Sequence, residues 1–222
     1  MKLTLTDMVA LEKQDEIYFL NKGAKLYVEE GYQDAAEYYH LAAAMGSNRA
    51  ASNLGYCYLY GRHCEANPEL AIAYFKLADA RSEQDGQLEE ATYKLGDIYE
   101  KGKYVEKDDE LAFYYYDRAI RQIPRWDSDQ YENNPSLCFA VARALMPDGI
   151  GHTDIKEAYR LLKFARNGYE KNVENGFNPH AESLEAVKTL LADPIFAEYV
   201  EKDLQKEKEK ESDDDSEEKD DD

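Results

Sequence analysis

Pairs of alanines seven residues apart recur four times along the chain, and they constrain its fold more than any other feature. The pairs are Ala35 and Ala42, Ala71 and Ala78, Ala112 and Ala119, and Ala158 and Ala165. Seven residues is nearly two helical turns, so both alanines of a pair lie on one helix face. Small side chains on that face allow a neighbouring helix to approach closely. The pattern predicts four helices that pack tightly against others.

Two large side chains stand at the third and fourth positions after the first alanine of each pair. They are Tyr38/Tyr39, Tyr74/Phe75, Tyr115/Tyr116 and Leu161/Leu162. They share the face of the alanines and are predicted to fill the core between helices. The run of three tyrosines at 114–116 is therefore divided. Tyr115 and Tyr116 are expected in the core, whereas Tyr114 points about 100° away around the helix and is expected on its outer side.

A second pattern, Leu-Gly-x-x-Tyr-x-x-Gly, precedes the alanine pairs. It occurs at residues 54–61 and 95–102, with weaker versions at 24–31 and 142–149. Its spacing is helical, and its last glycine suits a left-handed C-cap. Asn67, Asp108 and Asp154 each lie four residues before the next alanine and are suitable N-caps. The unit is therefore helix, turn, helix, repeated about four times.

The combined pattern resembles the Sel-one-like repeat, a relative of the tetratricopeptide repeat. The residues that carry the resemblance are Ala50, Leu54, Gly55, Tyr58 and Gly61 in one copy and Ala91, Leu95, Gly96, Tyr99 and Gly102 in another. The resemblance covers roughly residues 16–170 and is degraded in the first and fourth copies. It implies an all-α fold, an α/α superhelical solenoid of about four helix-turn-helix repeats.

Both ends of such a solenoid need a polar cap. We expect residues 1–15 to begin the N-terminal cap and residues 181–193 to supply a C-terminal capping helix. The spacing between copies lengthens near residues 81–87 and 123–134, which are expected to be surface insertions. These expectations give one solenoid domain over residues 1–200.

The chain ends in an acidic segment, residues 201–222, with 13 Asp/Glu against 5 Lys/Arg. We expect this tail to be largely disordered. The whole chain has a formal net charge of −20, which argues against nucleic acid or an anionic membrane as a partner and favours a neutral or basic protein. The first 16 residues contain no apolar run long enough for a secretion signal. Three cysteines, an odd number, suggest a reduced compartment, and we expect a cytoplasmic protein.

Chemistry-bearing residues form no recognisable catalytic, cofactor or metal pattern, and none is predicted. The cluster to weigh is Cys57, His63 and Cys64. It allows a metal site or a disulfide, but packing of small side chains explains it more simply. A secreted branch of the resembled family has disulfides between repeats, with activity on antibiotics. The corresponding positions here include Ala43 and Asp79 rather than cysteine, so that activity is not inferred.

The resemblance implies that first helices line a concave face where partners bind. Stepping along those helices gives the expected outward positions, namely Lys22, Arg49, Ser52, Tyr56, Tyr93, Asp97 and Glu100. Tyrosine among small and charged groups suits peptide binding. The single tryptophan, Trp126, lies in the 123–134 insertion. It is expected to dock onto the solenoid, with an exposed contact as the alternative.

These observations predict a non-catalytic scaffold or adaptor that binds a protein or peptide on its concave face. One alternative is a cytoplasmic immunity or inhibitor protein whose acidic surface neutralises a basic toxin. Another is a hydrolase acting on cell-wall or antibiotic substrates. The partner and the oligomeric state do not follow from the sequence.

Overall fold

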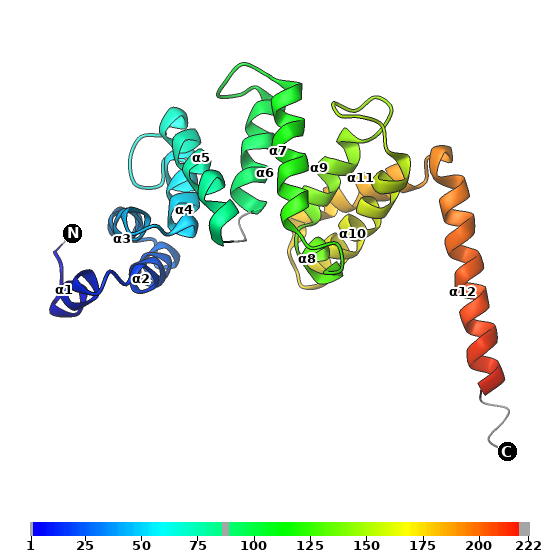
Figure 1. Cartoon of the computed structure of the whole chain (residues 1–222), viewed down its shortest axis with the longest axis horizontal. Coiled ribbons are helices and arrows are strands. Elements are labelled where there is room, and N and C mark those ends of the chain that lie inside the picture. The colour runs from blue at the N-terminus through cyan, green and yellow to red at the C-terminus, as the bar shows by residue number, and fades with distance from the viewer. Residues whose placement is uncertain (1, 86–88, 218–222) are drawn as a thin grey trace. The chain divides into compact units, whose positions relative to one another are not determined.

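The computed structural model describes residues 2–85 and 89–217 and is all-α, with no strand among those residues (Figure 1). It divides into two compact units, residues 1–124 and 125–222. The boundary falls inside the insertion expected at 123–134, within the stretch predicted to be one domain. The helices of the first unit are α1 (Leu5–Glu12), α2 (Glu16–Val28), α3 (Tyr32–Ala44), α4 (Asn48–Leu59), α5 (Pro68–Asp85), α6 (Glu89–Lys101) and α7 (Asp109–Gln122).

Consecutive helices of the first unit pack in pairs: α2 with α3, α4 with α5, and α6 with α7. Each pair also contacts the next, through α3 with α4 and α5 with α6. The predicted N-caps are present, since Asn67 accepts from the Leu70 amide at 3.0 Å and Asp108 from the Leu111 amide at 2.9 Å. This is the stacked helix-turn-helix arrangement that the sequence predicts, and the all-α solenoid is confirmed.

The alanine pairs are buried as expected, because all eight alanines have no exposed surface. Tyr115 and Tyr116 are also core residues, 8% and 1% exposed, whereas Tyr114 is 54% exposed. The division of the three tyrosines is therefore confirmed. The phenol of Tyr114 contacts solvent, while Tyr115 and Tyr116 fill the space between α6 and α7.

A glycine on each first helix is explained by the aromatic ring that packs on it. A Cβ atom added at Gly23 would lie 2.7 Å from the ring of Tyr39. At Gly55 it would lie 2.6 Å from the Phe75 ring, and at Gly96 it would lie 2.5 Å from the Tyr116 ring. The second bulky residue of the first three repeats thus requires a glycine opposite it, because no side chain fits in the contact.

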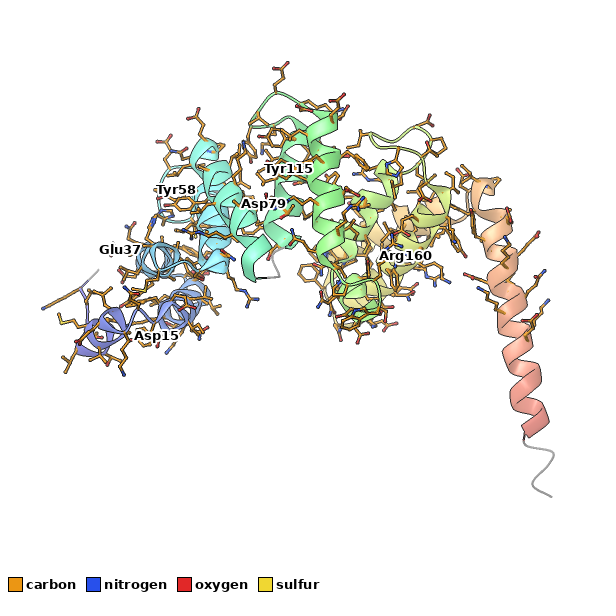
Figure 2. The ribbon with its side chains drawn as sticks, in the orientation of Figure 1. Asp15, Glu37, Tyr58, Asp79, Tyr115 and Arg160 are labelled. Atoms are coloured by element: carbon orange, nitrogen blue, oxygen red, sulfur yellow. The ribbon has the colours of Figure 1, made fainter. Side chains whose placement is uncertain are left out.

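Polar contacts also connect successive helix pairs. Arg118 on α7 donates through Nε to the Asp79 carboxylate of α5 at 2.8 Å, and Thr92 on α6 donates to the same oxygen at 2.7 Å. Arg81 donates to the carbonyl oxygen of Ala43 at 3.0 Å. Asp79, labelled in Figure 2, is nearly buried. Ala43 and Asp79 thus each accept a hydrogen bond from an arginine two helices further along the chain.

The second unit contains α8 (Ser128–Asn133), α9 (Pro135–Ala144), α10 (Ile155–Glu174), α11 (Ala181–Leu191) and α12 (Ala197–Glu217), with short 3-10 helices at Asn178–His180 and Pro194–Phe196. The long helix α10 packs on α8, α9 and α11. The α9–α10 pair is the fourth helix pair expected from the sequence, and α11 is the expected capping helix. The 123–134 insertion contains a helix of its own rather than an open loop.

Two further expectations differ from the structure. Trp126 is 83% exposed, so the prediction that it docks onto the solenoid is wrong. The expected boundary at residue 200 falls within α12, which is helical to Glu217. Disorder of the tail stays a prediction, and its last residues, 218–222, lie outside the described residues. In the insertion expected at 81–87, residues 81–85 continue α5, and residues 86–87 lie outside the described residues.

Candidate functional site

The seven residues predicted to face a partner differ widely in exposure. Arg49 is exposed, whereas Lys22, Tyr56, Tyr93 and Glu100 are partly buried. Two are buried: Ser52 is 2% exposed and Asp97 is 7% exposed. The outward placement of Ser52 and Asp97 is wrong. The reason is that α4 packs between α3 and α5, and α6 packs between α5 and α7, so that much of each helix surface is covered. Binding by the other predicted residues stays a prediction.

The structure brings two of these residues into a cluster on α4 and α6 together with three that were not predicted. We call it the α4–α6 cluster, and it comprises Tyr56, Tyr60, Lys94, Asp97 and Lys101. The rings of Tyr56 and Tyr60 stack with centroids 6.1 Å apart and planes 13° apart. The ammonium of Lys94 lies 6.0 Å from the Tyr56 centroid and 5.9 Å from that of Tyr60. These distances are within the range of a cation–π contact.

Asp97 fixes the two lysines of the cluster. Its carboxylate lies 3.0 Å from Lys94 Nζ and 2.5 Å from Lys101 Nζ, both on its own helix. Burial favours the neutral acid, but hydrogen bonds and the charges of the two lysines outweigh it, and the pKa of Asp97 is lowered. Burial likewise opposes ionisation of Lys94, yet Asp97 raises its pKa. Asp97 and Lys94 are therefore ionised at neutral pH, and the ammonium groups of both lysines have further N–H donors for a ligand.

The two tyrosines of the cluster have different roles. Tyr56 also packs edge-on against the buried ring of Phe75, with centroids 5.0 Å apart. Burial, reinforced by the nearby Glu90 carboxylate, raises the pKa of Tyr56 far above its ordinary value. Tyr60, in contrast, is 52% exposed. Tyr56 is thus part of the wall, and Tyr60 presents its ring to solvent.

A pocket of about 250 Å³ opens beside this cluster. It is lined by Leu59, Tyr60, Lys94, Asp97, Ile98, Lys101, Lys103 and Tyr104. Aromatic rings and an apolar floor are combined with lysine donors, which is the composition of a site for one side chain and its neighbouring carbonyl groups.

Tyr93 and Glu100, also on α6, support the core rather than this pocket. Tyr93 stacks on the Tyr116 ring at 5.8 Å, and Tyr116 donates its hydroxyl to Glu100 at 2.7 Å. Because Tyr116 is buried, Glu100 satisfies a core hydroxyl that would otherwise be unpaired. Both residues therefore hold α7 against α6.

Lys22 belongs to a separate cluster at the start of the chain. Its ammonium lies 2.5 Å from Asp7 Oδ1, and the other Asp7 oxygen accepts from the hydroxyl of Tyr38 at 3.1 Å. Burial favours protonation of Asp7, but hydrogen bonds from Lys22, Thr4 and Tyr18 outweigh it, and its pKa is lowered. The pair joins α1 to α2 and α3. Arg49, at the opposite end of α4 from Tyr60, is not part of either cluster.

Tyr60, Lys94 and Lys101 were missed by the sequence analysis. Each lies three or four residues from a residue that was predicted on the same helix: Tyr60 from Tyr56, and the lysines from Asp97. Residues with these spacings are neighbours on a helix surface. The signal was therefore present in the sequence.

The cysteine and histidine cluster offers little chemistry. All three cysteines of the chain are free thiols, so a disulfide between Cys57 and Cys64 is wrong. Burial raises the pKa of the Cys57 thiol to about 11, which leaves it protonated and weakly nucleophilic. The His63 ring packs edge-on against Tyr58 at 4.7 Å. Within residues 2–85 and 89–217, no group of three or more His, Cys, Asp or Glu side chains could hold a metal ion.

Crossing a bilayer requires a long apolar helical segment among the described helices. None of them has one.

Comparison with known proteins agrees with the helix pairs. A family model described as the Sel1 repeat matches residues 18–47, 48–78 and 89–123, which correspond to α2–α3, α4–α5 and α6–α7. A solved Sel1 repeat protein from Oxalobacter formigenes is 25% identical, with a TM-score of 0.45 over 55% of this chain and 92% of that one. A protective antigen present in uropathogenic Escherichia coli strains, described as displaying an SLR fold, is 18% identical with a TM-score of 0.46. That match covers 79% of this chain and 49% of the antigen. Residues 18–123 of the chain thus contain three Sel1 repeats, and each repeat forms one of the helix pairs.

Proposed function

We propose that this chain is a non-catalytic interaction scaffold that binds a protein or peptide partner on the face formed by its first helices. The α4–α6 cluster carries the proposal. It presents the ring of Tyr60, 52% exposed, beside a pocket in which Asp97 holds Lys94 and Lys101 in place. A rigid aromatic ring next to fixed donors is typical of an interface hot spot.

The chemistry of the pocket indicates what would enter it. An aromatic or long aliphatic side chain would lie against Tyr60 and Ile98, with its backbone carbonyl oxygens accepting from Lys94 or Lys101. At longer range, the net charge of −20 favours a partner that is neutral or basic overall and disfavours nucleic acid and anionic membranes. Of the predicted binding residues, Tyr56, Tyr93, Asp97, Glu100 and Lys22 would then act mainly by shaping the face.

Non-catalytic action is supported by the state of the strongest candidate nucleophile. The Cys57 thiol is buried, with a raised pKa, so Cys57 is not the activated nucleophile that the hydrolase alternative would need. The three free thiols favour the cytoplasmic location expected from the sequence.

The test uses two tyrosines matched for exposure, Tyr60 at 52% and Tyr114 at 54%. Three purified chains are immobilised: the wild type, Tyr60→Ala and Tyr114→Ala. The proteins that they capture are identified and then titrated individually. The proposal predicts that Tyr60→Ala weakens the affinity for the main partner about 30-fold, which corresponds to the loss of a hot spot of about 2 kcal/mol. Tyr114→Ala should bind like wild type. If Tyr60→Ala binds every captured partner like wild type, the α4–α6 cluster is not the site.

A further inference from the structure

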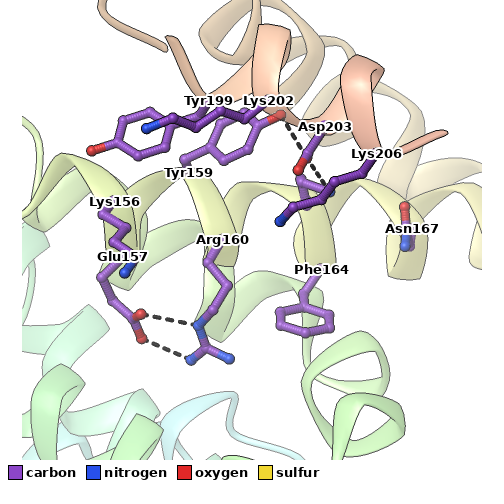
Figure 3. Close-up of a pocket in the computed structure, with 11 residues that line it drawn as sticks. Lys156, Glu157, Tyr159, Arg160, Phe164, Asn167, Tyr199, Lys202, Asp203 and Lys206 are labelled. Carbon is purple, nitrogen blue, oxygen red and sulfur yellow. Dashed lines mark hydrogen bonds and ion pairs between the residues drawn. The ribbon is translucent and has the colours of Figure 1, made fainter. Parts of the chain in front are cut away.

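A second and larger pocket lies in the other unit, between α10 and α12. Its volume is about 680 Å³, within the range of ligand sites. It is lined by Lys156, Glu157, Tyr159, Arg160, Lys163, Phe164 and Asn167 of α10, and by Tyr199, Lys202, Asp203 and Lys206 of α12 (Figure 3). On each helix these residues recur every three or four positions, so one face of each helix forms a wall.

Contacts at its base hold the two walls together. The rings of Tyr159 and Tyr199 stack with centroids 5.5 Å apart. Asp203 accepts from the Tyr159 hydroxyl at 3.1 Å and from Lys163 Nζ at 2.5 Å, as Figure 3 shows. Phe196, just before α12, is fully buried and packs against Tyr159. The pocket is therefore built from anchored side chains.

The charge of this pocket is opposite to that of the chain. Five basic side chains line it against two acidic ones, an excess of three positive charges, whereas the whole chain has a net charge of −20. Both acidic groups are already paired inside the pocket. Glu157 accepts two hydrogen bonds from Arg160, at 2.9 and 2.7 Å, and Asp203 is held by Lys163. Lys202 is paired with Glu198, four residues earlier on α12. Lys156 and Lys206 are left as the lining cations that would attract an anionic ligand.

The positive charges are spread along the pocket. Lys156 stands at the start of α10, whereas Lys206 comes from α12 beyond Asp203, and Figure 3 shows its ammonium reaching back toward Arg160. Lys156 and Asn167 are eleven residues apart on one helix, which is about 16 Å. A single phosphate or carboxylate cannot reach both ends. An extended peptide of about five residues does, and the rings of Phe164 and Tyr199 offer it apolar surface between the charges.

We propose that the α10–α12 pocket binds an acidic, extended peptide segment of a partner protein, with carboxylates at both ends and an apolar side chain between them. This goes beyond the proposed function, because the α4–α6 cluster and the general charge of the chain favour neutral or basic partners. Nucleic acid shares the negative charge, but a longer polyanion meets more of the surrounding acidic surface.

The experiment is fluorescence anisotropy with the full-length chain and a fluorescein-labelled peptide of about six residues, with one central phenylalanine and Asp or Glu elsewhere. The comparison probes are the same peptide with Asn and Gln in place of the acids, and a labelled oligothymidylate. The variant Lys156→Glu/Lys206→Glu reverses the charge at both ends of the pocket. Lys2→Glu/Lys13→Glu, at exposed positions of the first unit, is the control with the same change in net charge.

The proposal predicts saturable binding of the acidic peptide that weakens with added salt. The pocket variant should bind about tenfold more weakly or worse, whereas the control variant should stay within about twofold of wild type. Equal binding of the amide peptide, or undiminished binding by the pocket variant, would overturn it. If the oligothymidylate binds more tightly than the acidic peptide and the pocket variant loses that binding, the ligand of the pocket would be a nucleic acid and not a peptide.

Discussion

The contact between Gly55 and Phe75 allows a quantitative test of how the repeats are held together. A Cβ atom at position 55 would lie 2.6 Å from Phe75 Cε1 and 2.7 Å from Cδ1, whereas ordinary contacts begin at 3.4 Å. The ring would have to retreat by about 0.8 Å, but Phe75 has no exposed surface and packs against Tyr56. Overpacking of this kind costs about 1–3 kcal/mol. We expect the upper end, because the ring is fully buried.

Gly55→Ala also has a favourable component, since alanine stabilises a helix interior by about 1 kcal/mol relative to glycine. The net prediction is that the free energy of unfolding falls by about 2 kcal/mol. The measurement is urea unfolding followed by far-UV circular dichroism. Asn53→Ala, on the same helix, is the control and should be neutral or stabilising by about 0.5 kcal/mol.

A double-variant cycle separates the ring contact from other effects. In a Phe75→Leu background the side chain opposite Gly55 is shorter, so Gly55→Ala should cost at least about 1 kcal/mol less than in the wild type. The reasoning would be refuted if Gly55→Ala were as stable as wild type. It would also be refuted if the cost were the same in both backgrounds, since the glycine would then not be required by the ring.

Two further predictions concern pH. Asp7 has a lowered pKa in the folded chain, so its contribution to stability is present above the ordinary pKa of 3.8 and is lost as the pH falls below it. Asp7→Asn should lower the free energy of unfolding by about 2 kcal/mol at neutral pH and should flatten its dependence on pH in the acid range. Urea unfolding measures both. An unchanged free energy of unfolding at neutral pH would contradict the role of the pair between Asp7 and Lys22. His40 lies 3.1 Å from the hydroxyls of both Tyr58 and Tyr74, and burial, together with His63, lowers its pKa. The unfolded chain therefore takes up the proton more readily, and stability should decline as the pH falls through about 6.5. The free energy of unfolding of His40→Gln should decline less over the same pH range. Equal declines in the variant and the wild type would exclude His40 as the cause.

The fold was more predictable than the site because periodicity reports burial on one helix face and not on the others. The alanine pairs, Tyr115 and Tyr116 follow a strict spacing, and the structure buries all of them. Ser52 was placed outside because it steps away from Leu54 on the same helix. However, α4 is covered by helices on two sides, which a single-face pattern does not reveal. Trp126, in the insertion, was expected to dock, with an exposed contact as the alternative, and it is 83% exposed. No periodic pattern surrounds it that could have decided between the two.

The core of the repeat also determines how its binding face can be tested. The ring of Phe75 requires glycine at position 55, and Tyr56, the next residue, packs edge-on against that ring and stacks on Tyr60. Removing the Tyr56 side chain would therefore disturb the α4–α5 contact and the binding face together, and weaker binding would not distinguish the two. Tyr60 lies one helical turn later, stacks only on the outer side of Tyr56 and is half exposed. Loss of binding by Tyr60→Ala at unchanged unfolding free energy would thus report on the face itself, whereas loss accompanied by destabilisation would show that the face and the core cannot be separated.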